Sequence, residues 1–425
     1  MNARSGHALR WPQSSEDREV EHAIDQLLQR ELSADRAVEV ALLNSPRLKA
    51  EFEELAIARA DLVQAGLLKN PVFGALSTAF EGDQISPNLV FSVEEDFLAI
   101  VTMPMRKHLA ALQFEATKLE VGDQVLDLAA RVREAYYAAQ SAEQVLAMRA
   151  LVEEAARASG ELAQRQHEAG NMNDLTLNTQ LVLHAQTTLD RRRAEGEVAV
   201  AREKLNRLMG TWGPRTGWKL AARLPELPAE EPPLDRLESL AIEQRLDVGA
   251  ARRNVQALQY ALTLAKTTRW TGVISVSVEA ARLRDGRISF GPSVALEIPL
   301  FDQRQAQVAK LEAFARQADQ NLGALAVDVR AEVRASRVRV LTARAVVEDY
   351  GKVVVPLREK VVRLSQEQYD AMLLGVYQLI QAKQSEYEAY REYIDALRDY
   401  WVARSDLERA VGGRVGAPAG SGGKR

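Results

Sequence analysis

The 425-residue sequence contains no cysteine, which excludes disulfides, thiolate metal sites and a cysteine nucleophile. Only 6% of the residues are aromatic, but 47% are hydrophobic, which is enough apolar material for a folded core. Neither sign of charge dominates, because 55 basic and 59 acidic residues give a formal net charge of −4. This balance argues against a strongly basic nucleic-acid-binding protein, so we expect no nucleic-acid partner.

Long apolar runs are also missing. The longest stretch without Asp, Glu, Lys or Arg is the 15 residues 175–189, which include Thr, Asn, Gln and His. A membrane-spanning helix needs roughly 20 mostly apolar residues. The first 30 residues contain no apolar core of a signal peptide. Composition alone therefore favours a helix-rich protein without membrane helices.

Motifs that carry chemistry are absent as well. The five histidines form no recognisable metal-ligand spacing, and no phosphate-binding loop or Gly-x-Ser-x-Gly elbow occurs. We therefore expect no catalytic residue, no metal site, no cofactor and no enzymatic activity.

Proline is distributed unevenly. None lies between Pro104 and Pro214, and only Pro356 lies between Pro299 and Pro418. Because proline breaks helix interiors, these two stretches predict long helices. An isolated glycine in each, Gly170 and Gly375, predicts a helix C-cap and a tight reversal. The sequence thus predicts two long antiparallel helical hairpins, with 3–4 spacing typical of coiled coils.

The chain also contains an internal repeat of about 200 residues. The segment 41–50 aligns with 241–250, Pro104 with Pro299, and Gly170 with Gly375. We divide the chain into an N-terminal segment (1–32), a first repeat (33–209), a proline-rich connector (210–236), a second repeat (237–411) and a tail expected to be disordered (412–425). The predicted hairpins cover 105–209 and 302–411.

Each repeat carries a segment with period 2 ahead of its hairpin, which predicts strand pairs at 72–95 and 271–298. In the second pair, apolar residues alternate with small or polar ones. The strands approach the 9–11 residues that a tilted strand needs to cross a bilayer. Four strands cannot close a barrel, so several copies would have to pool them. We predict that one face meets lipid, through Ile274, Val276, Val278, Phe290, Val294 and Leu296. The alternative is a pair of soluble hairpins resting on the helices.

The order of these segments resembles the TolC-type outer-membrane efflux proteins, over roughly 32–412. The resemblance is carried by Ala41-Leu-Leu-Asn-Ser-Pro-Arg-Leu, Gln64-Ala-Gly-Leu-Leu-Lys-Asn-Pro, Val132-Arg-Glu-Ala-Tyr-Tyr and Gly291-Pro-Ser-Val-Ala-Leu-Glu-Ile-Pro-Leu-Phe. The segments 96–106 and 170–177 look most like the heavy-metal-cation branch of that family.

The resemblance implies a mainly α fold in a homotrimer. Its hairpins would form an α-helical barrel through the periplasm, and four strands per chain would build a shared 12-stranded barrel in the outer membrane. The implied partners are a periplasmic adaptor protein, an inner-membrane pump of the RND type and outer-membrane lipid. The implied role is a passive exit duct in efflux or type I secretion, and we expect metal cations as the cargo. An exported protein would need a signal upstream of Met1. The competing hypothesis is a soluble coiled-coil scaffold.

The resemblance also places an adaptor-docking tip on each hairpin. The tip residues are Gly170, Asn171, Met172, Asn173, Asp174, Leu175, Leu374, Gly375, Val376 and Tyr377. Family members can close the tip with aspartates, where this chain has Gln378 and Gln381. Asp174 is the nearest carboxylate and is the remaining gate-like position. The plainer interpretation of Asp174 is an N-cap of the following helix.

Overall fold

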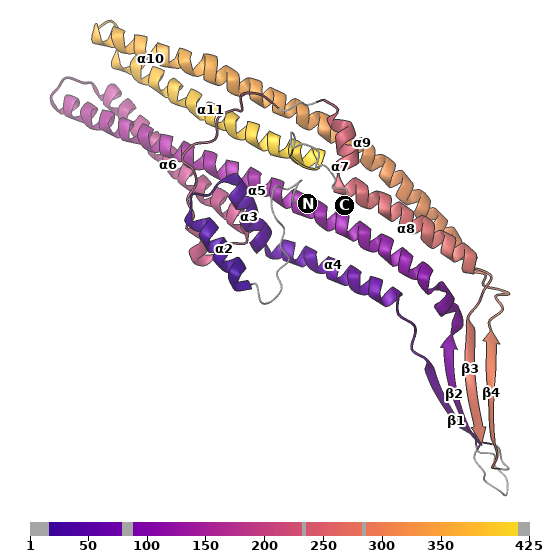
Figure 1. Cartoon of the computed structure of the whole chain (residues 1–425). Helices are drawn as coiled ribbons and strands as arrows, with labels where there is room; N and C mark the ends of the chain where they lie inside the picture. The colour runs from indigo at the N-terminus through magenta and orange to yellow at the C-terminus, as the bar shows by residue number, and fades with distance from the viewer. Residues whose placement is uncertain (1–16, 79–87, 232–234, 283–285, 415–425) are drawn as a thin grey trace. The chain divides into compact units, whose positions relative to one another are not determined.

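A computed structural model describes residues 17–78, 88–231, 235–282 and 286–414 (Figure 1). Most of the tail predicted at 412–425 lies outside this part of the chain. Within it, the structure is mainly helical with one small four-stranded sheet, which confirms the mainly α fold with a small β part.

The first repeat contains two short helices, a strand pair and a long hairpin. The N-terminal segment carries α2 (Asp17–Gln29), and the connector carries the 3-10 turn η1 (Gly213–Thr216). The elements of the repeat are α3 (Ala34–Asn44), α4 (Pro46–Ala65), β1 (Val72–Thr78), β2 (Asn88–Asp96), α5 (Phe97–Glu168) and α6 (Asp174–Met209).

The second repeat has the same order of elements. They are α7 (Leu237–Gln244), α8 (Leu246–Thr268), β3 (Ile274–Arg282), β4 (Ile288–Leu296), α9 (Gln305–Asp349), the π-helical turn η2 (Tyr350–Val354), α10 (Val355–Asp370) and α11 (Val376–Val411).

Each repeat opens with two consecutive helices that are separated by a single non-helical residue. Ser45 and Arg245 are the two breaks, each in an extended conformation, and their N–H groups donate to the carbonyls of Ala41 and Ala241. Each repeat ends on a left-handed glycine that packs against its own break. A Cβ on Gly210 would lie 2.9 Å from the Asn44 carbonyl oxygen, and one on Gly412 would lie 3.1 Å from the Arg245 Cα.

Two helices continue through positions where proline predicts a boundary. The α5 helix begins at Phe97 and contains Pro104, whereas the sequence places the hairpin from 105. Pro104 leaves the Ile100 carbonyl without its helical donor, and the Arg106 side chain donates to the neighbouring Ala99 carbonyl at 2.9 Å. Ahead of Pro356 the chain forms the π-helical turn η2. In this turn the backbone hydrogen bonds span five residues instead of four, just before the proline ring.

The four strands form one antiparallel sheet in the order β1-β2-β3-β4. The strand pair of each repeat is a hairpin, and β2 pairs with β3 to join the two repeats. The strands β1 and β4 are therefore the two edges of the sheet.

The chain forms two compact units, and each takes segments from both repeats. The hairpin unit comprises Met1–Ala50, Gly122–Arg245 and Asp328–Arg425, and the strand unit comprises Glu51–Val121 and Leu246–Val327. The core of the hairpin unit contains the fully buried side chains of Leu205, Met209 and Tyr400.

Among the described residues, no helix is both long enough and apolar enough to cross a membrane.

Candidate functional site

The sheet has two chemically different faces. Directly paired residues of an antiparallel sheet share a face. The register pairs Ile274 with Leu296 and Val276 with Val294. It also pairs Val278 with Val93. The apolar face thus extends across all four strands, and Ser77, Glu95 and Arg282 are its polar members near the strand ends. Its apolar members are Phe73, Ala75, Leu89, Phe91, Val93, Ile274, Val276, Val278, Ala280, Ile288, Phe290, Pro292, Val294 and Leu296.

The opposite face is small or polar along β3 and β4. Ser277 and Ser293 are paired there, and their hydroxyl groups share a hydrogen bond of 2.6 Å. Glu279 lies opposite Gly291, and Glu94 lies opposite Ser277. The alternation read from the sequence therefore continues in register across neighbouring strands.

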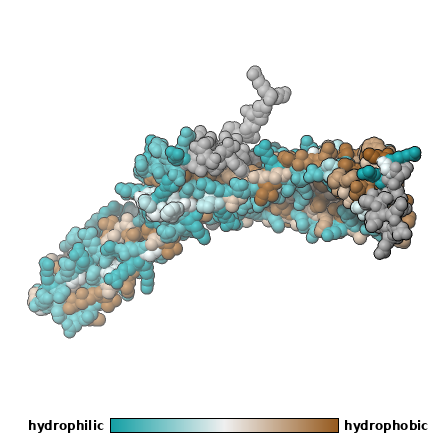
Figure 2. Space-filling view, turned by 90° about the horizontal axis from the view of Figure 1, so that it is seen from below, coloured by the Kyte–Doolittle hydropathy of each residue, from teal (hydrophilic) through white to brown (hydrophobic). Residues whose placement is uncertain are grey.

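Among the described residues of the strand unit, none covers the outer strand β4 of the apolar face. Phe290 is 75% exposed, Val294 68% and Leu296 59%. Figure 2 shows the hydrophobic residues gathered at the end of the picture where the strands lie. A contiguous apolar surface of this kind indicates contact with a membrane or with protein.

The first hairpin tip reverses the chain between α5 and α6. Gly170 has a φ of 76°, in the left-handed region that glycine adopts without steric cost. Its N–H donates to the His167 carbonyl and the Asn171 N–H donates to the Gln166 carbonyl, both at 2.8 Å. This pair of hydrogen bonds is a Schellman motif. It confirms the reversal predicted at Gly170.

The second tip has the same backbone conformation and hydrogen bonds, but with Met372 at the left-handed position instead of glycine. Met372 has a φ of 59°, and its N–H donates to the Tyr369 carbonyl at 2.9 Å. The Leu373 N–H donates to the Gln368 carbonyl, also at 2.9 Å. Met372 therefore occupies the position that Gly170 occupies in the first tip, and its side chain is 94% exposed.

The reversal predicted at Gly375 is wrong. Gly375 has a φ of −78° and is the N-cap of α11. The left-handed residue precedes the N-cap by three positions in both tips, so Gly375 corresponds to Asn173 rather than to Gly170. The alignment of Gly170 with Gly375 fails because the sequence comparison paired two glycines with different backbone roles.

The carboxylate at the first tip is also not the helix cap. Asn173 is the N-cap of α6, and its side chain accepts the Thr176 N–H at 2.9 Å. Asp174 follows in the first turn, is 85% exposed, and lies 3.4 Å from the Nε2 of His167. The His167 Nδ1 donates to the Met172 carbonyl at 2.9 Å, because a carbonyl oxygen only accepts. His167, in the last turn of α5, therefore contacts two residues on the α6 side of the tip.

The other gate-like positions lie on the first two turns of α11. The Oε1 of Gln378 accepts the Gly375 N–H at 2.8 Å, so this side chain helps to cap the helix. Gln381 is exposed. At the tip surfaces, Leu175 is 78% exposed, Leu374 is half-buried and Val376 is 36% exposed. The side chain of Tyr377 lies outside the described part of the chain.

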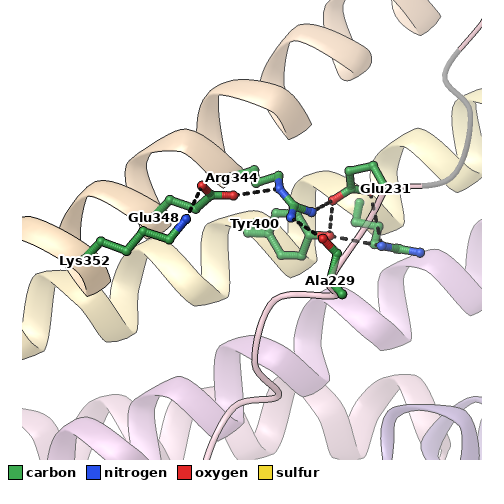
Figure 3. Close-up of polar contacts among 7 residues, drawn as sticks. Ala229, Glu231, Arg344, Glu348, Lys352 and Tyr400 are labelled. Carbon is green, nitrogen blue, oxygen red and sulfur yellow. Dashed lines mark hydrogen bonds and ion pairs between the residues drawn. The ribbon is translucent and has the colours of Figure 1, made fainter.

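An arginine of the second repeat binds the end of the connector (Figure 3). Arg344 on α9 contacts Glu231 at 3.0 Å and donates to the Ala229 carbonyl at 3.1 Å. It also pairs with Glu348, which Lys352 binds in turn at 2.8 Å. The side chains of Arg344 and Glu231 are only 19% and 13% exposed.

Helix α11 supplies the other contacts to Glu231. The Tyr400 hydroxyl donates to its carboxylate, and Arg404 approaches it at 3.3 Å. Burial and the hydrogen bond to Glu231 raise the pKa of Tyr400 to about 12, so the phenol stays protonated and remains a donor at neutral pH. Sequence reasoning missed this cluster, because residues more than 100 positions apart form it.

An arginine of the first repeat binds the start of the connector. Arg202 on α6 donates to the carbonyls of Thr216 and Trp218 at 3.3 and 2.7 Å. It also pairs with Glu143, and its guanidinium lies 3.9 Å from the centre of the Trp218 ring. Arginines of both repeats thus bind the connector, one near its start and one near its end.

The described residues contain no group of three or more His, Asp or Glu side chains arranged to hold a metal ion. The structure brings only two of the three gate-like residues, Gln378 and Gln381, onto one element. Gln378 and Gln381 share one helix, whereas Asp174 contacts His167 of its own hairpin.

Comparison with known proteins identifies the fold. A scan against protein-family models finds no match, and a search of curated proteins finds none. Among solved structures, a membrane protein from Pseudomonas aeruginosa has a TM-score of 0.73 at 20% identity, over 89% of this chain and 93% of that one. The outer membrane protein VceC of Vibrio cholerae has a TM-score of 0.73 at 16% identity, over 95% and 100%.

A third similar structure is the outer membrane channel CmeC of Campylobacter jejuni. Its TM-score is 0.72 at 15% identity, over 95% of this chain and 90% of that one. Proteins of this kind are channels rather than enzymes. The chain therefore has the fold of outer-membrane channel proteins.

Proposed function

We propose that this chain is the outer-membrane channel of a tripartite efflux or type I secretion system. The observation that carries the proposal is the sheet, which exposes one apolar face across four strands and ends in two edges, β1 and β4. Open strand edges are not tolerated in lipid, so a membrane-inserted sheet needs partners at both edges. The similarity in fold to outer-membrane channels supports the same role.

A homotrimer provides those partners. Three copies supply about 12 strands, within the range of outer-membrane barrels. The apolar face, including Ile274, Val276, Val278, Phe290, Val294 and Leu296, would then meet outer-membrane lipid. The polar face would line the channel, and the hairpins would extend it through the periplasm as an α-helical tunnel.

The two hairpin tips would dock on a periplasmic adaptor protein and, through it, on an inner-membrane pump of the RND type. Both tips carry exposed apolar side chains, namely Leu175 on the first and Met372 and Leu373 on the second. The channel itself would perform no chemistry, since the pump supplies the energy.

Metal cations are the cargo suggested by the sequence resemblance of 96–106 and 170–177. Deleting the gene and measuring survival on zinc, cobalt, cadmium and copper salts, with organic antibiotics in parallel, tests this part separately. Sensitivity to at least one cation is expected. Unchanged survival on all cations would contradict the assignment to metals without affecting the channel.

Cell fractionation with mass measurement tests the channel against the soluble scaffold. The channel is expected in the outer-membrane fraction, as a particle of three chains after detergent extraction. Recovery only in the cytosol as a monomer would overturn the proposal and favour the scaffold.

A further inference from the structure

The strand unit contains a cavity of about 420 Å³ where the strands give way to helices. Its walls come from α5, α8 and the start of α9. Apolar side chains form much of the lining, including Leu98, Leu109, Leu264 and Leu311. Three cationic side chains, Lys69, Arg106 and Arg304, also line it, with one carboxylate, Asp96.

The one carboxylate is already neutralised. The Lys69 ammonium lies 2.9 Å from the Asp96 Oδ2, while the Oδ1 accepts the Ala99 N–H at 2.9 Å. Asp96 offsets one of the three positive charges, so the cavity lining carries a net charge of about +2, since arginine stays protonated in proteins.

The guanidinium groups have few acceptors of their own. Arg106 donates to the Ala99 carbonyl, and its buried Nε has no hydrogen-bond partner. Arg304 donates to the Thr268 hydroxyl at 3.3 Å. Neither arginine is within 4.0 Å of a carboxylate among the described residues. Arg106 and Arg304 are half-buried, and the Nε of Arg106 is fully buried, so an anion with two or more acceptor oxygens would supply acceptors that these donors lack.

The cavity lies on the polar side of the sheet. Asp96 pairs with Ser275, which belongs to the face of Ser277 and Glu279. On the proposed function, this face lines the channel. An occupant would therefore arrive from the channel interior rather than from the lipid.

We propose that this cavity is a binding site for a small amphiphilic organic anion, with its carboxylate on Arg106 and Arg304 and its apolar part against the leucines. The volume is within the range of small-molecule pockets. The site rests on the proposed function for its access from the channel, and it adds organic anions to the cargo alongside metal cations.

Calorimetric titration of the detergent-solubilised full chain with octanoate, below its micelle concentration, tests the binding. Octylammonium and inorganic phosphate serve as comparison ligands. Octanoate is expected to bind at least tenfold more tightly than either. The double variant Arg106→Gln/Arg304→Gln is expected to weaken octanoate binding by about tenfold or more, since a charge-assisted hydrogen bond contributes this much.

The matched control is Lys107→Gln, because Lys107 is exposed, follows Arg106 directly and does not line the cavity. Its affinity for octanoate is expected to be unchanged. Arg304→Lys keeps the charge and is expected to retain binding within about threefold. If the double variant does not fold, Arg304→Gln alone is expected to weaken binding in the same direction.

Block of single-channel current in planar bilayers gives a second measurement of the same site. Octanoate is expected to block the wild-type channel, and the variant to need about tenfold more. Equal octanoate affinity in wild type and variant would overturn the site and leave the channel intact. Octanoate binding without any conductance would overturn the channel and leave the site intact.

Discussion

The two repeats build the same elements in the same order, and they differ most at their hairpin tips. The first tip places glycine at its left-handed position, whereas the second places Met372 there with the same pair of hydrogen bonds. A residue with a Cβ costs roughly 1–2 kcal/mol in that conformation. The second tip therefore has the same backbone conformation as the first, but Met372 is strained in it. The large apolar side chain of Met372 is also exposed. This difference suggests that the two tips present different surfaces to a partner.

The largest expected effect comes from the strand pair of the second repeat. Val276→Arg places a charge on the apolar face, where an arginine at the middle of a bilayer costs roughly 2–4 kcal/mol. We expect membrane assembly, measured as the trimer recovered from the outer-membrane fraction, to fall sharply. Ser277→Arg, on the opposite face of the same strand, is the control and should assemble. Normal assembly of Val276→Arg would show that the face assignment is wrong.

The second expected effect compares the two arginines that bind the connector. Arg344→Met removes contacts to Glu231 and to the Ala229 carbonyl, and hydrogen bonds to charged groups contribute about 1.5–3 kcal/mol each. We expect faster hydrogen exchange near the end of the connector, around 226–231, with little change at its start. Arg202→Met should do the reverse.

The exposed Arg358 on α10 takes no part in either cluster and provides the control, Arg358→Met. If both Arg344→Met and Arg202→Met open the whole connector equally, the two attachments are not independent.

The third effect tests the tips directly by moving glycine between them. Gly170→Ala should destabilise the first tip by about 1 kcal/mol, because alanine is strained at a φ of 76°. Met372→Gly should stabilise the second tip by about 0.5–1 kcal/mol. Local exchange of the tip amides measures both. Changes of the same sign in the two variants would contradict the equivalence of Gly170 and Met372.

The smallest effect is expected at the exposed carboxylate of the first tip. Asp174→Ala removes the contact with His167 and should change single-channel conductance or adaptor affinity by no more than about fivefold, since surface ion pairs contribute up to about 1 kcal/mol. Conductance in planar bilayers and adaptor binding in solution are the measurements. No change in either would leave Asp174 as a solvated residue of the first helical turn.

Much of the fold follows from local sequence patterns. The period-2 segments predict both strand pairs, because alternation is a property of neighbouring residues. The reversal at Gly170 is also local, since the residue needs a left-handed conformation that glycine favours.

Other features depend on contacts that the sequence pattern does not contain. Met372 adopts a conformation that local preferences assign to glycine, so the second reversal was placed at Gly375. Pro104 lies inside α5, and Arg106 donates to the Ala99 carbonyl in the turn before it. The Glu231 cluster joins three distant segments, and the basic cavity depends on three separate helices. None of these can be recognised from spacing alone.

Conductance of the purified full chain in planar lipid bilayers tests the central claim most directly. The account predicts discrete single-channel steps from wild-type protein, and none from Val276→Arg prepared in the same way. Wild-type protein that inserts into the bilayer as a trimer but never conducts would contradict it.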